Sequence, residues 1–453
     1  MKKILLLLLL PILAKSQQND TAFIKKIADE MLQNGQAYQL LHYLTKNIGG
    51  RLAGSSQYNQ AVQWSYETLK KFNSDTVFLQ ECLVPHWIRG HGDAAFLINK
   101  NESNTKKPLS MTAIGNSLGS QNVITAPLLF IENFDDLEKK KEAVKGKIVY
   151  YNAAFNPTNI RTFKSYSETA KYRVYGPSHA AKYGAIGVVV RSLSEATNNF
   201  PHTGTLVYND SFPTIPAICI GIEDADYIAA NAKTGNWFIS LKTHGKMLPD
   251  TINHNVIAEL KGTEFPNEYI TIGGHLDSWD ICEGAHDDGA GVVQTMEILR
   301  TFKALGYQPK HTIRFVLFAN EENGTRGGLK YAALAKDNNE KHIFALESDA
   351  GGFTPRGFGF TMSAEKIAAI QPWLFLLNPY GTEFLELGGG GADIGPLYKN
   401  FGTPIAGFIP DSQRYFDIHH AANDTFEKVN KRELLLGAVN MAALVYLVDK
   451  YGL

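Results

Sequence analysis

Five short polar segments in the C-terminal half of the sequence combine carboxylates with histidines. They contain, in chain order, His275, Asp277, Asp287, Glu321, Glu322, Asp349 and His420. Imidazole nitrogens and carboxylate oxygens are the ligands that zinc and similar divalent cations prefer. Metal ions held in this way lower the pKa of a bound water to about 7 and polarise carbonyl groups. The residue types therefore predict a hydrolytic metal site.

Each segment also has an ordinary interpretation when it is taken alone. A Glu-Glu pair such as Glu321-Glu322 is common at a solvated helix start, and the Asp-Asp-Gly sequence at 287–289 is common in turns. A lone histidine is more often a hydrogen-bonded polar residue than a ligand. Five such segments after successive predicted strands would need five independent coincidences, so together they favour a site.

The elements that must position these residues follow an alternating pattern from Asn253 onward. Apolar runs predict strands, and a period of about 3.6 residues predicts helices. The predicted strands cover 269–273, 313–319, 343–346 and 405–409, and the predicted helices cover 289–305 and 431–451. This order is typical of an α/β fold with a mostly parallel sheet flanked by helices. Ligands bind at the carboxyl ends of such strands, so the five segments should converge on one cleft.

The sequence changes character near Leu118, where short apolar strands alternate with loops and one or two helices. The segments 145–149, 180–188 and 215–218 resemble a protease-associated domain, a mainly β module inserted in exported peptidases. A length of 453 residues suits two to three domains. We therefore expect a catalytic domain formed by residues 17–117 and 249–453, interrupted by a protease-associated domain at 118–248.

The N-terminus is interpreted as an export signal rather than as part of the fold. Lys2 and Lys3 precede an apolar run at 4–13 and the small-residue pattern at 14–16, which predicts a signal peptide over residues 1–16. A membrane anchor needs roughly 17–25 apolar residues, so this run is too short, and no second run spans a bilayer. We expect a soluble protein exported to the periplasm or the extracellular space, without a membrane span.

Composition excludes several other classes. Hydrophobic residues make up 44% and charged residues 20% of the chain, which are globular proportions. The formal net charge is −1, and no basic stripe interleaved with aromatic residues is present. Nucleic acid is therefore not expected as a partner.

The polar segments together resemble a known family. The sequence at 273–291, with Glu321-Glu322, Asp349 and His420, is similar to the dizinc family of aminopeptidases and glutamate carboxypeptidases. The wording at 274–280, 284–288, 347–351 and 411–416 is especially similar to its plasma glutamate carboxypeptidase branch, also called carboxypeptidase Q. The similarity extends over nearly the whole chain after the signal, including the inserted domain.

This resemblance implies a role for each residue. His275 and Asp349 would hold one Zn²⁺, Glu322 and His420 would hold the second, and Asp287 would bridge both. His420 is preferred to His419 because the family's ligand stands four residues before an acidic-Thr pair, here Asp424-Thr425. Asp277 would orient His275. Glu321 would act as the general base that moves a proton from water to the leaving amine.

The resemblance says less about the substrate. Gly390 and Gly391 lie in a glycine-rich loop that is similar to the family's substrate-pocket loop. Arg414 and Tyr415 are candidates for binding substrate, and Arg414 would form either a clamp on a carboxylate or a structural salt bridge. The carboxypeptidase Q branch implies short peptides, with unblocked dipeptides as the leading expectation, and often a homodimer.

Three alternatives stay open at this point. The first is a glutamate carboxypeptidase that acts on N-blocked substrates. The second is a receptor-like protein that binds partners without catalysis, although such relatives lose metal ligands and all five are present here. The third is another amide hydrolase on the same scaffold, similar to glutaminyl cyclases.

Overall fold

The computed structural model describes residues 2–101, 105–233 and 236–453, with side chains from residue 18 onward. Its first sheet has a parallel centre, β12-β11-β13-β16, and mixed edges. In spatial order the strands are β1 (Thr76–Ile88), β10 (Lys246–Leu260), β12 (His311–Phe318), β11 (Phe265–His275), β13 (Lys341–Glu347), β16 (Ile405–Pro410), β14 (Pro355–Thr361) and β15 (Phe384–Leu387). The predicted α/β class is therefore confirmed, with antiparallel pairing at β1, β10 and β14.

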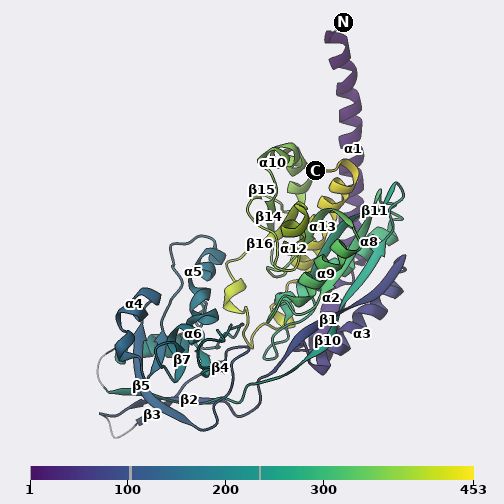
Figure 1. Ribbon diagram of the computed structural model, residues 1–453. Coiled ribbons are helices and arrows are strands. Elements are labelled where there is room, and N and C mark those ends of the chain that lie inside the picture. The colour runs from purple at the N-terminus through teal and green to yellow at the C-terminus, as the bar shows by residue number, and fades with distance from the viewer. Residues whose placement is uncertain (1, 102–104, 234–235) are drawn as a thin grey trace.

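Helices cover both faces of this sheet (Figure 1). The larger core joins one face to α1 (Lys2–Asn34), α2 (Ala37–Tyr43), α3 (Ser56–Lys71), α8 (Ala290–Ala304) and α13 (Lys431–Tyr451). A smaller core on the other face joins α9 (Arg326–Asp337) and α12 (Gly395–Phe401). The remaining helical segments of this unit are short: η1 (Leu44–Ile48), η3 (Ala285–Gly289), α10 (Ala364–Ile370), η4 (Gln371–Trp373), α11 (Leu374–Leu377), η5 (Asn378–Tyr380), η6 (Tyr415–Asp417) and η7 (Phe426–Lys428).

Two helices bear on the predictions about membranes and export. Within the part of the chain that the structure describes, only α13 is long and apolar enough to cross a membrane, and 83% of its apolar window is buried inside the protein. The predicted export signal, residues 1–16, falls where side chains are not described. Figure 1 shows the first part of α1 projecting from the molecule, whereas Ile24, Ile27 and Met31 on its second part are buried in the core.

A second sheet forms a separate unit beside the first (Figure 1). Its strands in spatial order are β3 (Thr105–Pro108), β2 (Ala94–Asn99), β9 (Trp237–Lys242), β5 (Ile124–Ile131), β6 (Ile148–Tyr151), β7 (Gly187–Arg191), β8 (Ala217–Ile220) and β4 (Met111–Ala113). Its helices are α4 (Phe134–Lys139), η2 (Lys141–Ala143), α5 (Thr162–Val174), α6 (Gly176–Ala181) and α7 (Ile222–Asn231). We call residues 94–242 the inserted unit.

The inserted unit begins earlier than the predicted boundary at residue 118. β2 pairs with β9 along its whole length, and β4 pairs with β8, so residues 94–113 belong to the second sheet. The early boundary was missed because these strands pair with segments about 100 to 140 residues later, which leaves no local signal. Its helices and parallel β5-β6-β7-β8 core also make the unit α/β rather than mainly β.

The flanking pieces fold together across the insertion. β1 and β10 form a long antiparallel ribbon, with Thr76 opposite Glu259 at one end and Ile88 opposite Lys246 at the other. This ribbon leads into the inserted unit and returns from it. Segments before and after the insertion therefore share one sheet, as the sequence pattern predicts.

Candidate metal centre

The predicted ligands converge at the carboxyl ends of the parallel strands. His275 ends β11, Glu322 follows β12, and Asp349 follows β13. The His275 Nε2 atom lies 3.2 Å from Asp287 Oδ1 and 3.3 Å from Asp349 Oδ1. These three residues form one group whose ligand atoms face each other.

A second group lies on the other side of Asp287. The His420 Nε2 atom lies 3.1 Å from Asp287 Oδ2 and 3.1 Å from Glu322 Oε2. Asp287 thus directs one carboxylate oxygen to each histidine. This is the arrangement that two ions sharing one bridging carboxylate require.

His419 is a weaker candidate than its neighbour. Its Nε2 atom is 3.5 Å from Asp287 Oδ2, and its ring stacks on that of His420 and contacts Tyr166. No ion pair joins His419 to Glu322 among the described contacts. His286 faces elsewhere, because its ring stacks on Phe353 and its Nδ1 accepts from the Gly352 amide. The geometry therefore favours His420 as the ligand.

The site fits a divalent metal. Asp287 Oδ2 and Glu322 Oε1 are buried without a hydrogen-bond donor. Burial disfavours a proton on His275, yet Asp349 and its neighbouring carboxylates outweigh burial and raise the pKa of His275 well above its ordinary value. Glu322 and Asp287 do the same for His420. Buried carboxylates that exceed their donors need cations, and two imidazoles with three carboxylates suit zinc.

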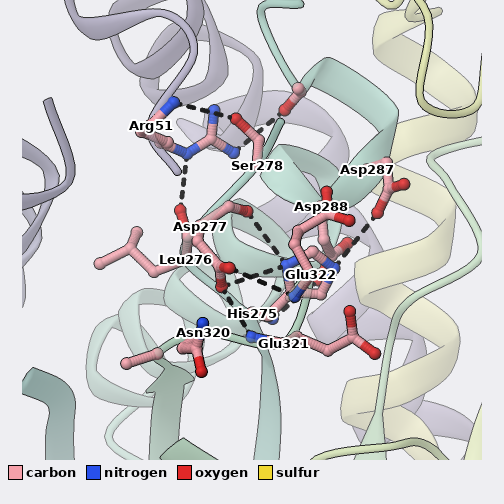
Figure 2. Close-up of polar contacts among 12 residues, drawn as sticks. Arg51, His275, Leu276, Asp277, Ser278, Asp287, Asp288, Asn320, Glu321 and Glu322 are labelled. Carbon is pink, nitrogen blue, oxygen red and sulfur yellow. Dashed lines mark hydrogen bonds and ion pairs between the residues drawn. The ribbon is translucent and has the colours of Figure 1, made fainter. Parts of the chain in front are cut away.

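Asp277 holds the base and the first histidine together (Figure 2). Its two carboxylate oxygens accept from the backbone amides of Glu321 at 3.0 Å and Glu322 at 3.3 Å. The His275 Nδ1 atom lies 3.0 Å from the Asp277 carbonyl and 3.6 Å from its carboxylate. Asp277 therefore contacts His275 mainly through its backbone, and its carboxylate fixes the Glu-Glu pair.

Glu321 is placed as a proton acceptor. Its half-buried side chain lines the cavity beside Glu322 and Asp349. Burial, reinforced by the nearby carboxylates and opposed by His275, raises the pKa of Glu321 well above its ordinary value. A raised pKa improves a carboxylate as a general base near neutral pH.

Arg51 supports the site from the N-terminal segment, and the sequence pattern gave no sign of this role. Its side chain is fully buried and donates to the carbonyls of Leu276 at 2.6 Å, Glu283 at 2.8 Å and Gly284 at 3.1 Å. Figure 2 shows the guanidinium beside the loop that follows β11. One side chain therefore ties together the two loops that carry His275 and Asp287.

Two further carboxylates fix the backbone of the ligand loops. Asp424 accepts from the amides of His286 at 2.9 Å and Asp287 at 3.1 Å. Asp288 accepts from the amides of His275 at 3.1 Å and Gly291 at 2.9 Å. A Cβ on Gly291 would lie 2.0 Å from the Ser348 carbonyl oxygen, so this close approach requires glycine.

Two cavities meet at the ligands. The metal cavity, about 550 Å³, lies between the catalytic sheet and the inserted unit and reaches Asp287, Glu321, Glu322, Asp349 and His420. The side cavity, about 380 Å³, lies beyond Asp349 and has Phe384, Phe408 and Ile409 among its walls. Phe163 of the inserted unit borders both.

The predicted substrate residues divide between these cavities and the surface. Gly390 and Gly391 line the side cavity, and a Cβ on Gly391 would lie 2.0 Å from Glu347 Cδ. Tyr415 is buried against the metal cavity. Arg414 borders neither cavity: its exposed side chain lies over Phe353 and is 3.5 Å from Glu433. The carboxylate clamp at Arg414 is therefore wrong, and the salt bridge takes its place.

His202 of the inserted unit should make the stability of the protein fall in mild acid. Burial lowers the pKa of His202 to about 3, so the folded protein keeps this ring neutral while the unfolded chain binds a proton near pH 6.5. The contribution is full above pH 6.5 and is lost as the pH falls towards 3. Between pH 7.5 and 4.5, His202→Leu should lose about 2 kcal/mol less unfolding free energy than the wild type.

Urea unfolding of metal-free protein at both pH values measures this difference. His91→Leu, at an exposed histidine, is the matched control and should behave like the wild type. An equal loss in all three proteins contradicts a neutral buried His202.

Comparison with known proteins decides the family. Residues 255–445, which include all five predicted metal ligands, match the model of peptidase family M28. The chain is also 35% identical over 415 residues to human Carboxypeptidase Q, covering 91% of this chain and 85% of that protein. The chain belongs to peptidase family M28.

Solved structures agree with this assignment. The M28 chain matches a peptidase M28 precursor from Shewanella amazonensis SB2B with a TM-score of 0.89 and 31% identity, over 95% of this chain and 97% of that one. A zinc aminopeptidase from Bacillus subtilis matches with a TM-score of 0.64 and 20% identity, over 91% and 94%, and shares the fold. The predicted metallopeptidase class and the resemblance to the carboxypeptidase Q branch are thereby confirmed.

Proposed function

We propose that this M28 peptidase is an exported dizinc exopeptidase that hydrolyses short peptides, above all dipeptides with a free amino terminus. The observation that carries the proposal is the position of Asp287, with one carboxylate oxygen facing His275 and the other facing His420. The short basic and apolar N-terminus supports export.

The chain's own residues supply positioning and proton transfer. His275 with Asp349, and His420 with Glu322, would each hold one zinc ion, with Asp287 between them. Zinc ions bound there lower the pKa of water and polarise the scissile carbonyl. Glu321 takes the proton from the attacking water on its carboxylate and delivers it to the leaving amine nitrogen. Asp277 keeps Glu321 in place through the backbone.

The inserted unit limits the size of the substrate. Residues at the start of α5 contact the catalytic domain beside the side cavity. Arg161 forms a two-bond ion pair with Glu386, the Thr162 hydroxyl donates to the Ser412 carbonyl at 2.8 Å, and the Gln413 amide donates to the Ile160 carbonyl at 2.8 Å. A cavity of about 550 Å³ closed in this way suits a small ligand rather than a folded chain.

The two cavities suggest how a dipeptide would lie. Carboxylates at Glu321 and Asp349 line the metal cavity and attract a free ammonium group. The aromatic walls of the side cavity, with Arg161 and Arg356 already paired to acidic residues, suit an apolar side chain. The free terminus and one apolar side chain are therefore the features that we expect the enzyme to recognise.

A panel of free, N-acetylated and C-amidated forms of one apolar dipeptide tests this substrate class. N-acetylation should lower kcat/KM more than C-amidation, by about 10-fold or more, because it removes a charged group from a carboxylate-lined site. Longer peptides should react more slowly, and casein should not be cut. Each reaction is repeated with a chelator to establish that cleavage needs metal.

Other outcomes would select an alternative. Preference for N-blocked substrates with a C-terminal glutamate would identify a glutamate carboxypeptidase. Internal cuts in long chains would exclude an exopeptidase. Metal binding without cleavage of any peptide in the panel would favour the receptor-like alternative.

A further inference from the structure

A loop of the inserted unit reaches the metal ligand His420. Residues 202–205, which we call the Thr203 loop, form an isolated antiparallel bridge in which His202 pairs with Ala421. The Thr203 amide donates to the His420 carbonyl at 2.8 Å. The His420 Nδ1 atom lies 3.3 Å from the Thr203 carbonyl oxygen. The inserted unit thus contacts both the backbone and the ring of this ligand.

The ring contact decides which nitrogen of His420 is free to bind metal. The Nε2 atom faces Asp287 and Glu322, so the proton of the neutral ring must sit on Nδ1 when Nε2 is a ligand. The Thr203 carbonyl is the acceptor for that proton. Such outer hydrogen bonds fix the tautomer and orientation of a metal-binding histidine. His420 also has a φ of +60°, a conformation that non-glycine residues adopt only with support from their surroundings.

Arg173 in turn fixes the Thr203 carbonyl. It lies on α5, is 3% exposed, and donates from Nη1 to Thr203 O at 3.2 Å and from Nη2 to the Tyr166 hydroxyl at 2.7 Å. Both acceptors are neutral, and burying a guanidinium on neutral acceptors is costly. The loop fits closely around it, since a Cβ on Gly204 would lie 2.3 Å from Arg173 Cζ.

We propose that Arg173 is a positioning residue for the metal site formed by Glu322 and His420: it holds the Thr203 carbonyl, which holds the His420 ring. The inserted unit then completes the metal centre as well as covering it. His275 has a separate support in Asp277, so the other metal site does not depend on Arg173. This inference rests on the proposed two-metal function.

The test measures the two zinc dissociation constants of full-length protein by competition with a chromophoric chelator. Arg173→Met should weaken one of the two constants by about 10- to 100-fold, the usual effect of losing an outer hydrogen bond, and leave the other unchanged. Arg173→Lys, which keeps a donor, should recover part of the loss. Tyr166→Phe, which removes only one partner of Arg173, should give a smaller loss at the same site.

Arg191→Met is the matched control. Arg191 is a buried arginine of the same unit that pairs with Asp226 and lines neither cavity, so its replacement should leave both constants unchanged. Circular dichroism establishes that each variant folds, and the Lys and Phe variants decide the question if Arg173→Met does not. Equal weakening of both sites, or no change at either, overturns the inference. A wild-type protein that binds fewer than two ions refutes the proposed function instead.

Discussion

Replacing Glu321 by glutamine should lower kcat by about 10²- to 10⁴-fold while both metal ions stay bound. Glutamine keeps the shape of the side chain and cannot accept the proton of the attacking water. The backbone amide of residue 321 still donates to Asp277, so the loop should keep its position. Elemental analysis and steady-state kinetics on an unblocked dipeptide measure the two quantities on the same preparation.

The matched control is Glu264→Gln, at an exposed glutamate beside the opposite end of β11, and it should be as active as the wild type. Added zinc should not restore the Glu321→Gln variant. Near-normal kcat in this variant would show that another group moves the proton. Loss of metal would show that Glu321 is a ligand rather than the base.

Replacing Asp287 by alanine should remove both ions and nearly all activity, because one carboxylate serves both histidines. The loss of affinity should exceed the roughly 10- to 100-fold that loss of an outer hydrogen bond causes. Glu322→Ala should instead weaken one site only. Metal content after dialysis, followed by kcat/KM with and without added zinc, distinguishes these outcomes.

Asp210→Ala, at an exposed position of the inserted unit, controls for the substitution itself and should keep two ions. Two ions retained in Asp287→Ala would mean that Asp287 does not bridge. One ion lost in both Asp287→Ala and Glu322→Ala would assign Asp287 to the His420 site alone. One ion in the active wild-type protein would refute the two-metal proposal.

The inserted unit has consequences for how the activity could be controlled. It borders both cavities through Phe163, and the Thr203 loop contacts a metal ligand. Movement of this unit would therefore change access to the cleft and the position of His420 together. Substrate entry and metal affinity should be linked in this M28 peptidase.

The sequence by itself determined the catalytic α/β unit and the identity of the site. The apolar runs at 269–273, 313–319 and 343–346 become β11, β12 and β13 because buried parallel strands need continuous apolar residues. Polar residues placed directly after such strands must meet at one edge of the sheet. This local rule brought His275, Glu322 and Asp349 together before any contact was known.

Tertiary structure alone decided which groups support those ligands and where the inserted unit begins. Arg51 donates to Leu276 from 225 residues away, and the Thr203 carbonyl lies beside His420 across 217 residues. The pairing of β2 with β9 moved the boundary of the inserted unit to residue 94, and the packing of Arg414 on Phe353 removed it from the cleft. Contacts over such separations depend on how whole elements pack, and no local period or motif encodes them.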